Sequence, residues 1–162
     1  GKVAPISENI RRTSMYKNIL VAIDDSETSR CALAEALHIA RTSNAKLYVT
    51  HVADETLLSM HGRTFTTTLN LDHAVAAIAD AGRKLLDQAM QSATGVNAEA
   101  LLLEARQRRV SETLAEKAKE LGVDLIVIGR HGQRGLATLI LGSVAEQLAK
   151  IADASVLLVR NH

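Results

Sequence analysis

The chain has 162 residues, with 19 Lys and Arg against 18 Asp and Glu, so its formal charge is +1 with histidine neutral. This balance excludes the broad basic surface typical of nucleic-acid binding, and an aromatic content of 2% leaves no platform for base stacking. A single cysteine, Cys31, excludes an internal disulfide and favours a reducing, cytoplasmic location. The sequence holds no apolar run long enough to cross a membrane, so we expect no membrane insertion.

The first residues, GKVAPISENIRRTS, lack the apolar stretch of a signal peptide. We expect residues 1–14 to be an expression tag or an unstructured arm. Met15 stands directly before the first regular pattern, and no repeat or linker follows it. Residues 15–162 are therefore expected to form one domain.

Short apolar runs rich in branched residues alternate with amphipathic runs of helical spacing. In chain order we predict a strand at 17–24, a helix at 25–44, a strand at 45–54, a long connection at 55–70, a helix at 71–93, a strand at 97–105, a helix at 109–124, a strand at 124–129, a glycine-rich loop, a helix from about Val144 and a strand at 154–160. Asp25 or Ser26 is the expected N-cap of the first helix.

Strands that alternate with helices predict an α/β domain with an open parallel sheet and helices on both faces. In such a sheet, ligands bind outside the carboxyl ends of the strands. The glycine-rich loop leaves from that edge.

The loop carries the spacing G-x2-G-x9-G-S, formed by Gly129, Gly132, Gly142 and Ser143. Gly129 and Gly132 can adopt positive φ and bring backbone amides close to a ligand. Ser143 with Glu146 forms a capping box, S-x-x-E, which predicts a helix start with free amides and partial positive charge. An anion such as a phosphate is the expected ligand.

The alternative is structural: each glycine serves a turn, and Ser143 only caps its helix. The loop has no lysine, so it is not the P-loop G-x-x-x-x-G-K-[ST]. The first strand-to-helix turn reads DDSETS rather than G-x-G-x-x-G, which disfavours a nicotinamide or flavin dinucleotide.

Single residues at the same edge also have two interpretations. Asp24 either contacts a ribose hydroxyl or Mg²⁺, or it caps the next helix. Arg130 and His131 either neutralise phosphate charge or belong to a solvated basic loop. For His51, within a strand, we expect a partly buried ring with a satisfied hydrogen bond rather than a ligand.

Five segments, ILVAIDDS, LYVTHV, DLIVIGRHG, LILGSVAEQ and SVLLVR, resemble the universal stress protein family in its ATP-binding branch. The resemblance runs from about Tyr16 to Arg160. It implies a five-stranded sheet in the order 3-2-1-4-5, a Rossmann-like fold of the adenine nucleotide alpha hydrolase type. The last strand then lies at the edge of the sheet, where an apolar strand needs a cover, and we expect a homodimer through residues 155–160.

The resemblance also implies an adenine nucleotide, ATP or else ADP or AMP, bound with Mg²⁺ for which Asp24 is the candidate ligand. The expected nucleotide-binding residues are Ala22, Ile23, Asp24, Val52, Ile128, Gly129, Arg130, His131, Gly132, Gly142, Ser143 and Val144. Of these, Ala22, Asp24 and Val52 would line the adenine and ribose end, and Gly132, Gly142, Ser143 and Val144 would hold the phosphates.

The function expected from this resemblance is that of a nucleotide-dependent homodimeric regulator in the stress response, acting on an unidentified protein partner. One alternative is a slow ATPase or phosphotransferase, although no nucleophile and base pair stands out. Another is a dimeric scaffold that binds no nucleotide. An enzyme beyond slow ATP hydrolysis is not expected.

Overall fold

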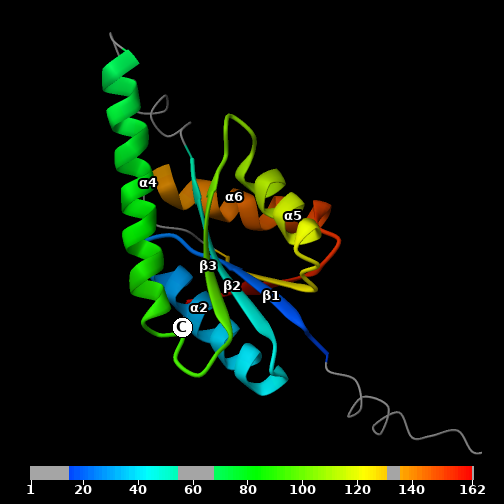
Figure 1. Cartoon of the computed structure of the whole chain (residues 1–162). Coiled ribbons are helices and arrows are strands. Elements are labelled where there is room, and N and C mark those ends of the chain that lie inside the picture. Colours follow the sequence, from blue (N-terminus) through cyan, green and yellow to red (C-terminus); the bar gives the residue numbers. More distant parts are fainter. Residues whose placement is uncertain (1–14, 55–67, 131–135, 162) are drawn as a thin grey trace, which may run out of the picture.

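A computed structural model describes residues 15–54, 68–130 and 136–161. Figure 1 shows the elements, which follow one another in the order β1 (Asn18–Ala22), α2 (Glu27–Ser43), β2 (Lys46–Ala53), α4 (Thr68–Met90), β3 (Ala98–Glu104), α5 (Val110–Glu120), β4 (Leu125–Gly129), α6 (Leu136–Ile151) and β5 (Ser155–Val159). Every strand predicted from an apolar run is present, and each end lies at most two residues inside its predicted bound. Most of the connection predicted at 55–70 lies outside the described residues.

The five strands form one parallel sheet in the order β3-β2-β1-β4-β5, which confirms the predicted α/β fold and strand order. β1 lies in the centre, and its last residue, Ala22, is in register with Thr50 of β2 and Ile128 of β4. The carboxyl ends of these three strands therefore meet at one edge of the sheet.

In the described part of the chain, α2 and α4 cover one face of the sheet and α5 and α6 cover the other (Figure 1). Ile19 and Val21 of β1 pack in the apolar cluster that includes residues of α2 and α4. Leu20 and Ala22 pack in the opposite cluster, with residues of α5 and α6. Because side chains alternate along a strand, successive residues at the ends of β1 and β2 point to different layers.

Helix α2 begins with a side-chain cap. Ser26 is the N-cap, and its Oγ accepts a hydrogen bond from the backbone N–H of Ser29 at 3.1 Å. The cap satisfies one of the amides that the first helical turn leaves without a partner. Of the two predicted caps, Asp25 and Ser26, it is Ser26 that caps.

Helix α6 begins at Leu136, so its predicted start at about Val144 is wrong. The segment LATLIL before Gly142 contains good helix formers and no proline, and a single interior glycine weakens a helix by only about 1 kcal/mol. Helix propensity therefore extends the helix past the capping box. Gly142 and Ser143 lie inside α6 rather than at its N-terminus.

Candidate functional site

The carboxyl edge of the sheet brings several of the expected nucleotide-binding residues together. Ala22 and Ile128 are register partners, 4% and 0% exposed. Val144 of α6, 5% exposed, belongs to the same apolar cluster, and half-buried Val52 packs against it. These four side chains form an apolar layer on the α5 and α6 face, directly below the ends of the strands.

Asp24 follows β1 and is held by the turn into α2. Its backbone N–H donates to Oγ of Ser29 at 2.8 Å, and its Oδ1 accepts from the backbone N–H of Ser26 at 2.8 Å. Ser29 is 1% exposed, so the network is anchored in the protein interior. Oδ1 of Asp24 therefore stabilises the turn that leads into the N-cap Ser26 rather than capping the helix itself, and neither bond uses Oδ2.

Gly129 ends β4, and the positive φ expected for it is not observed. Among the described glycines, positive φ occurs at Gly95 and Gly122. What Gly129 permits instead is close packing, because an added Cβ would lie 2.8 Å from Cγ2 of Thr28 and 3.3 Å from its backbone carbonyl carbon. The first glycine of the motif therefore lets the first turn of α2 approach the end of β4.

The rest of the glycine motif is only partly described. His131 and Gly132 lie outside the described residues. Arg130 is exposed, and its backbone N–H donates to the carbonyl of Val159 at 2.8 Å. Because Gly142 and exposed Ser143 are inside α6, the expected set of bare amides at a helix start is not formed there.

His51 of β2 makes the satisfied hydrogen bond that the sequence predicted. Its Nδ1 lies 2.7 Å from the carbonyl oxygen of Ile23, and the ring is half-buried. The helix above it has a glycine at the point of contact: a Cβ at Gly82 of α4 would lie 2.8 Å from Cδ2 of His51. Gly82 is not among the residues predicted from the sequence, although an isolated glycine within a helical pattern is a signal of close packing.

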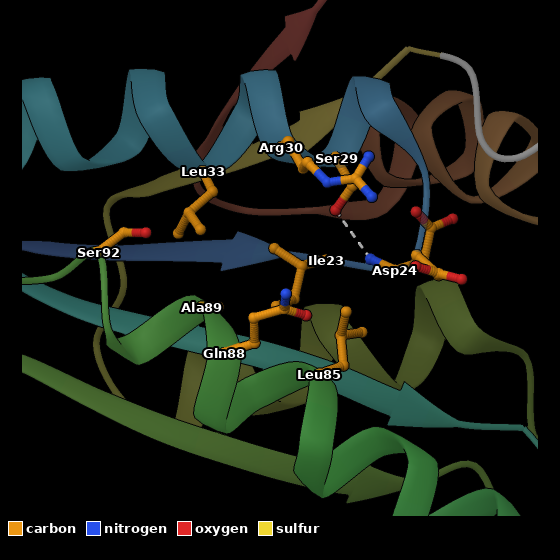
Figure 2. Close-up of a pocket in the computed structure, with 10 residues that line it drawn as sticks. Ile23, Asp24, Ser29, Arg30, Leu33, Leu85, Gln88, Ala89 and Ser92 are labelled. Carbon is orange, nitrogen blue, oxygen red and sulfur yellow. Dashed lines mark hydrogen bonds between the residues drawn. The ribbon is translucent and has the colours of Figure 1, made fainter.

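A cleft of about 200 Å³ opens between α2 and α4 (Figure 2). Leu33 of α2 and Leu85 of α4 flank Ile23, and Asp24 lies at one end of the cleft. Only Ile23 and Asp24 of the expected nucleotide-binding residues line it. The cleft is on the face of the sheet opposite Val52, so it is separate from the apolar layer described above.

Within the described ranges, no group of three or more His, Cys, Asp or Glu residues is placed to hold a metal ion. Asp24 and the adjacent Asp25 line the same cleft, but they do not belong to a group of three such residues in this part of the chain. None of the helices in the described ranges is both long and apolar enough to cross a membrane.

Comparison with known proteins gives the family. The sequence model described as "Universal stress protein family" matches residues 15–160. The universal stress protein YxiE of Bacillus subtilis is 34% identical over 149 residues, which span 90% of this chain and 100% of that protein.

Solved structures of the family share the fold. A universal stress protein from Burkholderia pseudomallei, 33% identical, superposes with a TM-score of 0.69 over 91% of this chain and 98% of its own. A universal stress protein solved in complex with cAMP is 27% identical, with a TM-score of 0.62 over 89% of this chain and 97% of its own. Since the family match extends over nearly the whole sequence, the chain belongs to the universal stress protein family.

Proposed function

We propose that this universal stress protein binds an adenine nucleotide at the carboxyl edge of its sheet and acts as a nucleotide-dependent homodimeric regulator. The observation that carries the proposal is the backbone of Val52. Strand β1 ends two residues before the level of Val52, because the last register pair of β1 with β2 is Ala22 with Thr50. A nucleotide base at this edge would find backbone groups that face the space beyond β1.

The direction of these groups follows from alternation along β2. The carbonyl of Thr50 accepts a bond from Ile23, so Thr50 faces β1, whereas the carbonyl of Ala53 accepts from Ala105, so Ala53 faces β3. Alternate residues of a strand direct their backbone groups to opposite sides. The N–H and C=O of Val52 therefore face β1, at a level that β1 no longer occupies.

The pair of groups at Val52 suits adenine. An N–H donor beside a C=O acceptor complements adenine, which offers an acceptor at N1 and a donor at N6. The sugar would then lie toward Asp24, whose Oδ2 takes no part in the turn, and toward Gly129. Ala22, Ile128 and Val144 would supply the apolar floor.

The phosphates would extend toward Arg130 and the rest of the glycine motif. Gly142 and Ser143 lie inside α6, so their amides would become available only if α6 unwound to Ser143. The capping box of Ser143 and Glu146 would then stabilise the shortened helix, and its N-terminus would face the phosphates. Mg²⁺ would arrive with the nucleotide, and Asp24 would supply one ligand from the protein.

Two further observations support the proposal. A universal stress protein that is 27% identical to this chain has been solved in complex with cAMP, and this supports an adenine nucleotide as the ligand here. The apolar edge strand β5 supports a dimer, since Leu158 is 39% exposed there. The regulatory partner is expected to be a protein that distinguishes the nucleotide-bound dimer from the free one.

Protein denatured directly after purification should release an adenine nucleotide, which mass spectrometry would identify. Titration calorimetry with ATP, ADP, AMP and cAMP would then rank the affinities of the emptied protein. Single-turnover hydrolysis no faster than in buffer would exclude the ATPase alternative. Failure of all four nucleotides to bind would contradict the proposal.

Asp24→Asn tests the site, with Asp25→Asn as its matched control. Asn keeps the Oδ1 that accepts from Ser26, so the turn is retained, while both variants lose one negative charge. A charged hydrogen bond contributes about 1.5–3 kcal/mol, so Asp24→Asn should weaken ATP binding by roughly 10- to 100-fold. Equal losses in the two variants would show that charge alone, and not contact with Asp24, matters.

A further inference from the structure

The ring of His51 donates the hydrogen bond to Ile23 that the backbone of β2 would donate if the β1–β2 ladder continued. Ile23 directs its N–H to Thr50 of β2 at 2.8 Å, so its C=O also faces β2. In a continued parallel ladder that carbonyl would accept from the N–H of Val52. In the structure it accepts from Nδ1 of His51 at 2.7 Å, and the register ends at Ala22 and Thr50.

The bond also determines which ring nitrogen carries the proton. A carbonyl oxygen only accepts, so Nδ1 of His51 must be the donor. The side chain of His51 points toward α4, while its own backbone groups face β3. His51 therefore reaches across to Ile23 with its side chain and gives up none of its ladder bonds.

Gly82 is the second, independent observation. An added Cβ there would lie 2.8 Å from Cδ2 of His51 and 2.8 Å from Cδ1 of Leu102. Glycine inside a helix is unfavourable by about 1 kcal/mol relative to alanine. The glycine thus allows α4 to lie directly on the imidazole, which fixes the plane of the ring.

We propose that His51, seated under Gly82, is a positioning residue that ends the β1–β2 ladder early and keeps the N–H and C=O of Val52 available for adenine. This inference rests on the proposed function. The same pair of backbone groups does not complement guanine, which presents a donor at N1 and an acceptor at O6, so that donor would face donor and acceptor would face acceptor. His51 therefore supports selectivity for adenine without touching the base.

Two substitutions separate the hydrogen bond from the bulk of the ring. In His51→Asn, the side-chain amide nitrogen can take the place of Nδ1 and donate to Ile23. In His51→Leu, the donor is lost, and the carbonyl of Ile23 becomes free to accept from Val52. His38→Leu, on the exposed side of α2, is the control for removal of a histidine.

Calorimetric titration with ATP and with GTP gives the decisive ratio. Wild type, His51→Asn and His38→Leu should all prefer ATP, while His51→Leu should lose at least about tenfold in ATP affinity, equivalent to 1.4 kcal/mol, with little change for GTP. Gly82→Ala, which displaces the ring and leaves its chemistry intact, should shift the ratio in the same direction. An unchanged ATP-to-GTP ratio in folded His51→Leu would overturn the role of His51.

Measurements on the nucleotide-free protein distinguish this inference from the proposed function. ¹⁵N NMR of the imidazole should show the proton on Nδ1, and the amide of Val52 should exchange faster in wild type than in His51→Leu, where the ladder closes. A proton on Nε2 would overturn the inference even if ATP binds. Absence of nucleotide binding by the wild type would overturn both proposals together.

Discussion

Gly129 and Gly82 have the same role at two places in the molecule. Each omits a Cβ that would lie 2.8 Å from a side chain of a neighbouring element, Thr28 in one case and His51 in the other. Real carbon atoms do not approach so closely, so each glycine determines how near a helix can lie to the sheet. At the candidate site, the distance between helix and sheet thus depends on the missing Cβ of a glycine as much as on the chemistry of the side chains.

Gly129→Ala should destabilise the protein by about 1–3 kcal/mol, the usual effect of overpacking a filled site. Thr28 lies in the first turn of α2 and is 7% exposed, so its side chain has little room to move. Thr28→Ser removes the Cγ2 that the new methyl group meets, and the double variant should recover part of the loss. Urea unfolding of the four proteins in the cycle measures this coupling, and strictly additive effects would contradict the contact.

For single residues, the sequence indicates which side chains are important better than it indicates which residues they contact. Asp24 is predicted to contact a ligand or to cap the next helix, but the residue that caps α2 is Ser26, and Oδ1 of Asp24 accepts from the backbone N–H of that cap residue. Thr28 could not be predicted as the neighbour of Gly129, because the two residues are far apart in the chain and meet only through the β1–β4 pairing. The glycine spacing indicates where another group approaches the backbone closely, but it does not identify that group as a ligand or as a helix.

Helix α6 contains two starts within one sequence. Leu136 begins the helix in the structure, and the Ser143–Glu146 capping box provides a second start one residue after Gly142. Propensity favours the long form, because LATLIL contains strong helix formers, Leu and Ala, and no proline or glycine. The capping box and the dipole favour the short form whenever an anion lies at Ser143.

Gly142→Ala should stabilise the long form by about 1 kcal/mol, and so weaken ATP binding by up to about fivefold if binding requires the short form. Ile140→Pro breaks the helix before Ser143 and should leave ATP affinity unchanged or higher. Backbone chemical shifts of the free variants would verify the helix bounds, and calorimetry the affinities. Weaker binding by Ile140→Pro alone would show that the coupling has the opposite sign.

The contrast between strands and α6 explains what local patterns predict. The strands are predicted from apolar runs such as ILVA, for which no other local structure competes. Their predicted positions are confirmed. The start of α6 came from a cap signal that competes with the propensity of the residues before it. A capping box stabilises a helix end where one forms, but it does not prevent the helix from extending further.

The order β3-β2-β1-β4-β5 places the ends of β1, β2 and β4 together and leaves β5 at the edge of the sheet. The first consequence positions the candidate nucleotide site, and the second creates an open edge. Ser155 and Val159 direct backbone groups to β4, so Val156 and Leu158 direct theirs outward by alternation. Nucleotide binding and dimerisation would therefore use different strands of one rigid sheet.

Leu158→Pro tests the proposed dimer at that edge. Proline removes an N–H that faces outward and leaves the β4–β5 ladder intact, a substitution that edge strands tolerate. Light scattering after size exclusion should show a dimer for wild type and a monomer for this variant, with unchanged far-UV circular dichroism. Ile151→Lys, which changes a 46% exposed apolar residue on α6, should remain dimeric. A dimeric Leu158→Pro protein would exclude pairing through β5. A wild-type protein that stays monomeric across the micromolar range would remove dimerisation from the proposed function, because an edge strand that pairs only at higher concentration would not act as a regulatory switch.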